Sequence, residues 1–173
     1  MTKPPKFIFM ILRTVLKFKN NPKKIREFLK LVGIKENMKV LDYGCGIGSY
    51  SLEAGKIVGE SGTVIAAEIN NIMLEALEKQ IETRGVTNIN PMLIKSMEDI
   101  EDTNFDFILL IDVLQLIEDK IDMIDSLLKK LSANGKLVIK FEHFKQDEID
   151  PLLNGCMCSD KKLIYKKYWS LSK

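Results

Sequence analysis

From Lys39 onward the sequence alternates short apolar runs with longer stretches of helical periodicity, and this alternation restricts the fold more than any other feature. Apolar runs such as Phe107–Ile111 must be covered on both sides, as in a parallel sheet whose crossovers are helices. We therefore predict a doubly wound α/β domain. The predicted strands are Lys39–Leu41, Thr63–Ala67, Ile89–Ile94, Phe107–Ile111 and Lys136–Phe141, the helices are Tyr50–Val58, Ile72–Thr83 and Ile121–Leu131, and Ala133–Gly135 is a turn.

Both ends of the chain depart from this alternation. The first 33 residues hold two predicted helices, 6–18 and 22–32, and the second has Asn21 as a cap, Pro22 in its first turn and Gly33 at its end. At the other end a short helix at 147–153 precedes two strands with no helix between them. Those strands, about Met157–Ile164 and Tyr168–Leu171, predict a closing antiparallel hairpin.

Composition limits the chain to one compact domain of 173 residues. The 26 basic and 24 acidic side chains nearly cancel, but residues 1–30 hold 9 Lys/Arg against 1 Glu, 31–159 hold 12 against 22, and 160–173 hold 5 against 1. Three cysteines and one histidine fit neither a disulfide framework nor a zinc site, so we expect no metal and a reducing, cytoplasmic setting. The opening apolar run Phe7–Leu12 is too short for a signal peptide or a membrane span.

The segment Val40–Ser49 carries the most chemical information, because three glycines follow a strand directly and precede a helix directly. Missing side chains let a ligand approach the backbone at the carboxyl edge of the sheet, where open α/β folds bind nucleotides. Position 49 is Ser, so the spacing is G-x-G-x-G and differs from the dinucleotide pattern G-x-G-x-x-G. A tight turn that binds nothing is the alternative.

Two carboxylates strengthen the functional interpretation. Glu68 ends the second predicted strand, 20 residues after Gly48, where it could accept both ribose hydroxyls of a nucleoside lying over the turn. Asp42 precedes the first glycine and could bind either N–H groups of the turn or a cationic ligand group. Each carboxylate alone would be an ordinary residue at the end of a strand, but together with the glycines they indicate a nucleoside site.

Four consecutive segments resemble the motifs of the class I S-adenosylmethionine-dependent methyltransferases. Within that class the resemblance is to the broad small-molecule group that includes the ubiquinone/menaquinone biosynthesis C-methyltransferases. The resemblance covers about residues 34–172 and implies a seven-stranded, mostly parallel, Rossmann-like sheet of order 3-2-1-4-5-7-6 with strand 7 antiparallel. It also implies a helical lid segment at 1–33, a cofactor-binding domain at 34–173, S-adenosylmethionine as cofactor and a small-molecule methyl acceptor. The four segments are Val40–Ser49, Thr63–Asn70, Phe105–Ile117 and Leu127–Phe141.

The resemblance also assigns cofactor-binding residues. Glu68 would hold the ribose hydroxyls, Ile69 would press on the adenine face, and Asp112 would border the transferring methyl group. Where relatives commonly place an Asp for the adenine amino group, this chain has Ser96 followed by Met97, with Glu98 or Asp99 as possible replacements. The methionine and ribose part would lie on Asp42, Gly44, Cys45 and Gly46.

No general base is evident, because many relatives have His where this chain has Gln115, and glutamine cannot take up a proton. We therefore assign no catalytic residue. Direct in-line transfer depends mainly on holding the nucleophile near the methyl group, an effect that contributes about 7–11 kcal/mol. A thiolate, phenolate, enolate or amine would need little assistance, whereas a poorly acidic alcohol would need a base.

Several negative signals narrow the partners. No Asn/Asp-Pro-Pro-Tyr/Phe motif follows the fourth strand, no Pro-Cys pair is present, and 23 Lys stand against 3 Arg, which together argue against nucleic acid as substrate. The basic N-terminal segment is open to three interpretations: a lid, a peripheral contact with an anionic membrane through Phe7, Phe9, Phe18 and Phe28, or plain core covering.

Two other functions compete with methyl transfer. A catalytically silent S-adenosylmethionine-binding regulatory module would explain Ser96 and Gln115. A nicotinamide oxidoreductase would need the third glycine that Ser49 replaces. We interpret Cys156 and Cys158 as ordinary strand residues, and His143 either as a surface residue or as a substrate contact.

Overall fold

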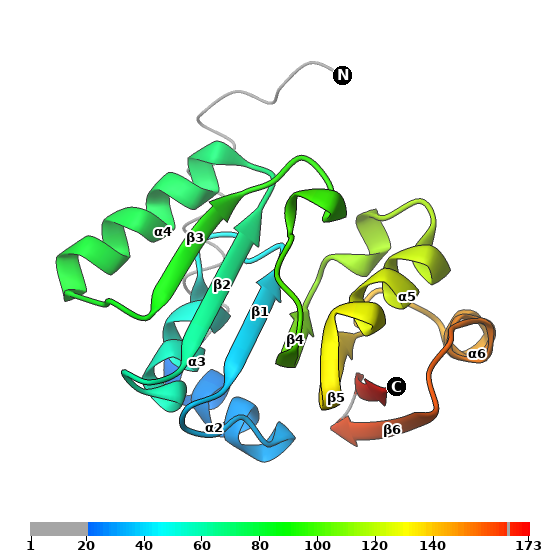
Figure 1. Ribbon diagram of the computed structural model, residues 1–173. Helices are drawn as coiled ribbons and strands as arrows, with labels where there is room; N and C mark the ends of the chain where they lie inside the picture. The colour runs from blue at the N-terminus through cyan, green and yellow to red at the C-terminus, as the bar shows by residue number, and fades with distance from the viewer. Residues whose placement is uncertain (1–20, 166) are drawn as a thin grey trace.

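The computed structural model describes residues 21–165 and 167–173. It contains one seven-stranded sheet in the order β3-β2-β1-β4-β5-β7-β6, in which β7 is antiparallel to both of its neighbours and the other neighbouring pairs are parallel (Figure 1). This confirms the predicted sheet order and the closing hairpin. The strands are β1 Lys39–Tyr43, β2 Thr63–Glu68, β3 Ile89–Leu93, β4 Phe105–Leu110, β5 Leu131–Lys140, β6 Asp160–Tyr165 and β7 Tyr168–Ser172.

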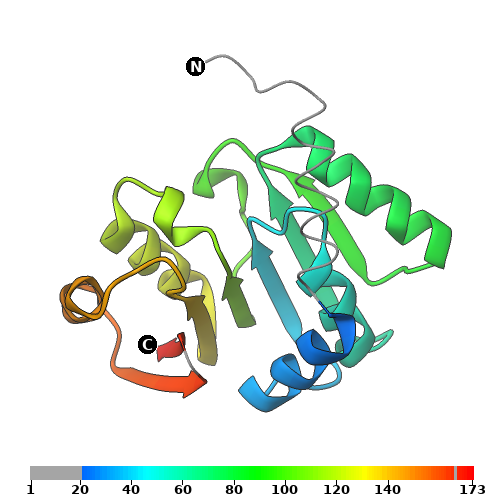
Figure 2. The same ribbon diagram turned by 180° about the vertical axis from the view of Figure 1, so that it is seen from behind.

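Helices cover both faces of the sheet, as the apolar strands require. Alternate residues of each strand belong to two separate cores: Val40 of β1 and Phe107 of β4 face one core, and Leu41 and Ile108 face the other. The core around Val40 is closed by α2, α3 and α4, and the core around Leu41 by α5 and α6 (Figure 2). The helices are α2 Pro22–Val32, α3 Ser49–Val58, α4 Asn71–Arg84, α5 Lys120–Lys130 and α6 Gln146–Gly155, with short 3-10 turns η1 Met97–Asp99 and η2 Leu114–Leu116.

Helix α2 begins and ends where the sequence predicts. The Asn21 side chain accepts hydrogen bonds from the N–H groups of Lys23 and Lys24, and Gly33 ends the helix with a φ of 108°. Leu29 on its inner face is fully buried in the core that contains β1 and β4. The helix is therefore part of the folded core. The division of the chain at residue 33 stays a prediction, and the helix predicted at 6–18 lies outside the described residues.

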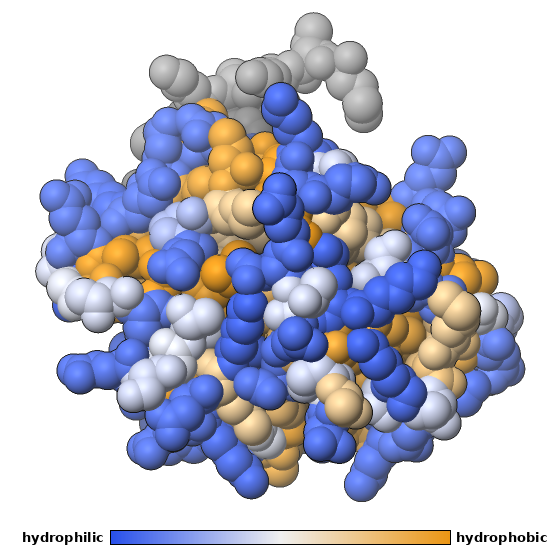
Figure 3. Space-filling model, in the orientation of Figure 1, coloured by the Kyte–Doolittle hydropathy of each residue, from blue (hydrophilic) through white to orange (hydrophobic). Residues whose placement is uncertain are grey.

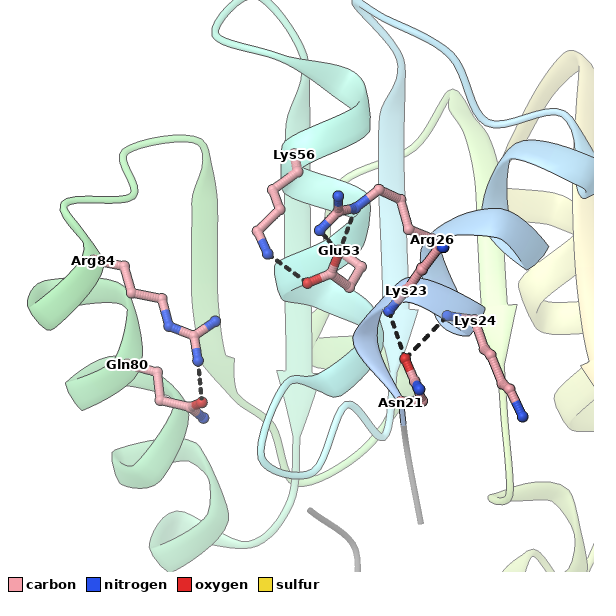
Figure 4. A network of polar contacts seen from close by, with 8 residues as sticks. All are labelled: Asn21, Lys23, Lys24, Arg26, Glu53, Lys56, Gln80 and Arg84. Atoms are coloured by element: carbon pink, nitrogen blue, oxygen red, sulfur yellow. Dashed lines mark hydrogen bonds and ion pairs between the residues drawn. The ribbon is translucent and has the colours of Figure 1, made fainter. Parts of the chain in front are cut away.

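An ion-pair network joins α2 to α3. The Glu53 carboxylate is buried on α3 and pairs with Arg26 of α2 at 2.6 Å and with Lys56 of its own helix at 2.5 Å (Figure 4). Both cations remain about half exposed, so each keeps part of its hydration while it neutralises the buried carboxylate. The network fixes how α2 lies against α3.

Two segments differ from the sequence prediction. The prediction that Cys156 and Cys158 are strand residues is wrong: both lie in the connection after α6, and β6 begins only at Asp160. The physical reason is a hydrogen bond to α5. The N–H of Met157 donates to the Asp125 carboxylate at 2.7 Å and holds this connection away from the sheet.

The predicted turn Ala133–Gly135 is instead part of β5. Pairing with β4 is irregular there, since Phe105 pairs with Leu131 and Phe107 with Lys136. Gly135 makes this close passage feasible, because a Cβ at that position would lie 2.5 Å from the carbonyl oxygen of Phe105. A bulged strand replaces the expected break.

The surface is largely hydrophilic on the face seen in Figure 1, and hydrophobic side chains gather toward its upper part (Figure 3). In Figure 1 the arrows of β1, β2 and β3 point toward this upper edge, so the carboxyl ends of these strands lie there. Within residues 21–165 and 167–173, no helix combines the length and the apolar character needed to cross a bilayer.

Candidate active site

The turn between β1 and α3 has a conformation that depends on glycine. Gly44, Gly46 and Gly48 all have φ between 57° and 82°. A Cβ on Gly44 would collide with Val113, and one on Gly48 would collide with Leu77, so both positions are closed by packing. Gly46 differs, because the nearest atom to its added Cβ would be the Met73 sulfur at 3.8 Å. The turn is therefore open at Gly46 alone among these three glycines.

Glu68 lies directly beside this opening. Its Oε2 accepts a hydrogen bond from the N–H of Gly46 at 2.8 Å, and its Oε1 accepts from the N–H groups of Ile69 and Asn70, both at 2.9 Å. The side chain is only 7% exposed, so these three donors provide the compensation that a buried carboxylate requires. The structure thus brings Glu68 to the glycine turn, and its contact with ribose stays a prediction.

Asp42 lies beneath the turn and is 3% exposed. Its Oδ2 accepts from the Ser51 hydroxyl at 2.5 Å, so the helix α3 supplies its partner, whereas two of the turn's N–H groups, those of Gly44 and Cys45, bond to the Ala67 carbonyl. Burial, opposed by hydrogen bonds from Ser51 and increased by the charge of Glu68, raises the pKa of Asp42 to about 6. A buried carboxylate of this kind would be stabilised by a nearby cation.

The adenine side of the predicted site lies along the same edge, at the ends of β2 and β3. Ile69 is 69% exposed, and its predicted contact with the adenine face stays a prediction. Ser96 and Met97 follow β3, which pairs with β2 up to Glu68 and Leu93. The predicted replacement Asp99 is already engaged, since its carboxylate accepts from the N–H groups of Lys95 and Ser96. A hydrogen bond from Ser96 lowers the pKa of Glu98.

On the other side of β1, Asp112 follows the end of β4 and has a φ of 58°, a left-handed conformation that Asp tolerates better than most residues. Its Oδ2 pairs with the Lys140 ammonium at 3.0 Å, and its carbonyl accepts from the Gln115 amide at 2.6 Å. The Gln115 Oε1 is buried and has no donor among the described residues. Asp112 and Gln115 therefore share one small polar cluster.

A cavity of about 760 Å³ adjoins this cluster, and sequence reasoning missed the residues that define it. Tyr50 comes from the first turn of α3, Lys140 ends β5, and Tyr168 begins β7 directly opposite Lys140. The two tyrosine hydroxyls are 3.1 Å apart, and burial raises the pKa of Tyr50 above its usual value. The only sequence signal was a lysine at the end of an apolar strand. Its other lining residues are Asn21, Lys24, Ile25, Glu27, Phe28, Leu31, Glu142 and Tyr165.

The geometry of this edge bears on the cofactor that the sequence predicts. The open turn at Gly46, the fixed carboxylate of Glu68 and the buried carboxylate of Asp42 match the ribose hydroxyls and the cationic groups of an adenosyl sulfonium in chemical type. The residues present therefore fit such a ligand. Among the described residues, no group of His, Cys, Asp and Glu side chains is arranged to hold a metal ion.

Comparisons with known proteins agree with this geometry. Residues 34–169 match the family described as methyltransferase domain. The ubiquinone/menaquinone biosynthesis C-methyltransferases UbiE of Haemophilus ducreyi and Shewanella piezotolerans are 31% and 33% identical over 122 residues, which cover 69% of this chain and 46% and 49% of theirs. The chain thus spans about half the length of these curated relatives.

Solved structures show the same fold. A SAM-dependent methyltransferase from Aquifex aeolicus has a TM-score of 0.72 at 21% identity and covers 91% of this chain and 95% of its own. A methyltransferase described as putative and S-adenosyl-L-methionine-dependent, from Methanococcus maripaludis, has a TM-score of 0.79 at 16% identity, with coverages of 100% and 97%. The chain therefore belongs to the methyltransferase domain family and has the class I fold of that family.

Proposed function

We propose that this protein is an S-adenosylmethionine-dependent methyltransferase that acts on a small molecule by direct in-line transfer. The observation that carries the proposal is the Glu68 carboxylate, buried and bonded to the N–H of Gly46 beside the one open position of the glycine turn. The family match and the names of the relatives support the same activity.

The proposed cofactor contacts follow from the order of the residues along the sheet edge. Glu68 would accept from the ribose hydroxyls at Oε2, the oxygen that has only one backbone donor. Ile69, Ser96 and Met97 would border the adenine. The cationic methionine part would lie over Gly44, Cys45 and Gly46, near the carboxylate of Asp42.

S-adenosylmethionine, when bound, supplies an electrophilic methyl group on a sulfonium. The task of this chain is then to exclude water and to hold the acceptor atom in line with that group. Asp112 lies next to the cavity through its ion pair with Lys140, so the proposed position of the methyl group and the cavity are adjacent. Burial raises the pKa of the Cys45 thiol, which argues against a covalent role for this cysteine.

The cavity supports a lid role for the N-terminal segment 1–33. Residues 21–31 contribute six of its lining side chains, from Asn21 at the helix cap to Leu31 near the helix end. Helix α2 would therefore form one wall of the acceptor site.

Titration calorimetry with S-adenosylmethionine, with S-adenosylhomocysteine and with NAD tests the proposal. We expect the first two to bind and NAD to give no heat. Release of S-adenosylhomocysteine with a panel of small acceptors would then identify the substrate. Absence of binding by both adenosyl compounds would refute the proposed function.

A further inference from the structure

The acceptor cavity has an unusual concentration of aromatic and charged side chains. Three of the four tyrosines in the chain line it, together with Phe28, whose ring lies 4.2 Å from that of Tyr168. Figures 1 and 2 both show α2 beside the β6 edge of the sheet. The cavity is lined by residues of α2 together with Lys140 at the end of β5, Tyr165 of β6 and Tyr168 of β7. Aromatic walls favour a planar ligand, because offset or edge contacts between rings are stabilising.

Lys140 connects this cavity to the site of methyl transfer. It lines the cavity, and its ammonium also pairs with Asp112 at 3.0 Å. The side chain is only 12% exposed and lies 5.7 Å from the centre of the Tyr168 ring. Partial burial alone would lower the pKa of Lys140, but the hydrogen bond to Asp112 and the charge of nearby Glu142 raise it overall. The lysine therefore remains an ammonium.

Lys140 has more N–H donors than it has hydrogen-bond acceptors among the described residues. An ammonium has three N–H donors. Among the described residues, its oxygen partners are Asp112 at 3.0 Å and Glu142 at 3.6 Å, the second beyond ordinary hydrogen-bond distance. At least one donor is thus left for a ligand in the cavity.

We propose that Lys140 is the specificity-determining residue for the methyl acceptor, and that it binds an oxygen anion carried by a small aromatic ring. This inference rests on the proposed function and deepens it by naming the substrate class. The ring lies among Phe28, Tyr50 and Tyr168, and its oxygen anion receives the free N–H of Lys140. A charge-assisted hydrogen bond of this kind is about twice as strong as a neutral one.

Three probes of similar shape separate the sources of such an anion: 4-nitrophenol, 4-nitrobenzoate and the neutral ether 4-nitroanisole. Each is titrated into the full chain saturated with S-adenosylhomocysteine, by calorimetry, and the phenolate absorption band gives the pKa of bound 4-nitrophenol. The variants are Lys140→Met, Lys140→Arg, and Lys23→Met as a control that removes an exposed lysine of α2 that does not line the cavity.

We expect at least one anionic probe to bind more tightly than 4-nitroanisole, and Lys140→Met to weaken it roughly tenfold to a hundredfold. Lys140→Arg should retain most of the affinity, and Lys23→Met should leave it unchanged. Bound 4-nitrophenol should show a lowered pKa in the wild type and in Lys140→Arg, but not in Lys140→Met. The stronger anionic probe identifies phenolate or carboxylate as the source.

The inference is overturned if no probe binds, if the ether binds as well as the anions, or if Lys140→Met binds the anionic probes as tightly as the wild type does. A thermal melt of each variant shows whether it is folded, and the exposed positions of Asp112 and Glu142 make unfolding by Lys140→Met unexpected. Failure of the proposed function is distinct, since it appears as loss of adenosyl-compound binding by the wild type itself.

Discussion

The carboxylate of Glu68 holds the glycine turn through Gly46, whose N–H donates to Oε2 at 2.8 Å. The other oxygen of Glu68 is fixed by the N–H groups of Ile69 and Asn70. A side chain with three backbone partners has little rotamer freedom left to lose when a ligand arrives. The proposed ribose contact is thus oriented before binding.

Replacing Glu68 by Ala should weaken both cofactor binding and the fold. The variant loses charged hydrogen bonds to the ribose, which corresponds to about 1.5–3 kcal/mol of binding free energy, and it leaves three backbone N–H groups without their partner. Calorimetry at a temperature where the variant is folded measures the first effect. Glu60→Ala, at an exposed position, is the control, and equal affinities for the two variants would contradict the ribose assignment.

Comparing Gly46→Ala with Gly85→Ala should separate the effect of an added methyl group on ligand affinity from its effect on stability. Gly46 and Gly85 have similar φ values, 57° and 61°, and neither Cβ would meet an atom closer than 3.8 Å. Each substitution should cost about 1–2 kcal/mol of stability because L-residues disfavour this conformation. Only Gly46→Ala should also lower affinity for S-adenosylmethionine, since its methyl group would enter the proposed cradle. Unchanged affinity in Gly46→Ala would show that the turn binds no ligand.

Stability should depend on pH through Asp42. Burial, partly offset by Ser51, raises its pKa from 3.8 to about 6, so the folded protein retains this proton to a higher pH than the unfolded chain. The contribution of this group is therefore complete below about pH 4 and is lost as pH rises through about 6, by about 3 kcal/mol at 1.36 kcal/mol per pKa unit.

Urea denaturation of the wild type and of Asp42→Asn between about pH 4 and about pH 7 checks this. As pH rises, the free energy of unfolding of the wild type should fall relative to that of Asp42→Asn, because Asn retains the bond from the Ser51 hydroxyl and cannot ionise. A difference that does not change with pH would mean that Asp42 is ionised throughout.

Breaking the contact between α2 and α3 should destabilise the protein. Arg26→Met removes two short contacts to the Glu53 carboxylate, at 2.6 and 2.7 Å, and leaves Lys56 as the remaining cation (Figure 4). We expect a loss of about 1–3 kcal/mol of unfolding free energy, below the cost of a wholly unpaired buried charge. Lys23→Met, on an exposed position of the same helix, should change stability little.

The sequence predicted the parts of the fold that depend on local patterns. Asn21, Pro22 and Gly33 predict the two ends of a helix through local capping preferences, and the helix has those ends. The order of the sheet came from the resemblance, because periodicity identifies strands without their neighbours. The segment around Cys156 was assigned wrongly, since the bond from Met157 to Asp125 joins residues 32 positions apart and leaves no local signal.

The candidate site likewise contains residues that the sequence predicted and residues that it did not. Glu68 and the glycine turn stand at the ends of predicted strands, so the topology of a parallel sheet brings them to one edge. Lys140 and Tyr168 meet only because β7 runs antiparallel to β5. The Tyr50 hydroxyl on α3 contacts the Tyr168 hydroxyl on β7. Their roles required the three-dimensional structure.

Helix α2 serves two purposes on opposite sides. Leu29 anchors it in the core, while Leu31 on the outer side is 63% exposed and faces the cavity. Substitutions on the outer side can alter which molecules are accepted without loosening the anchor. Divergence among related chains in acceptor preference could therefore accumulate along a single helix face while the cofactor edge stays the same.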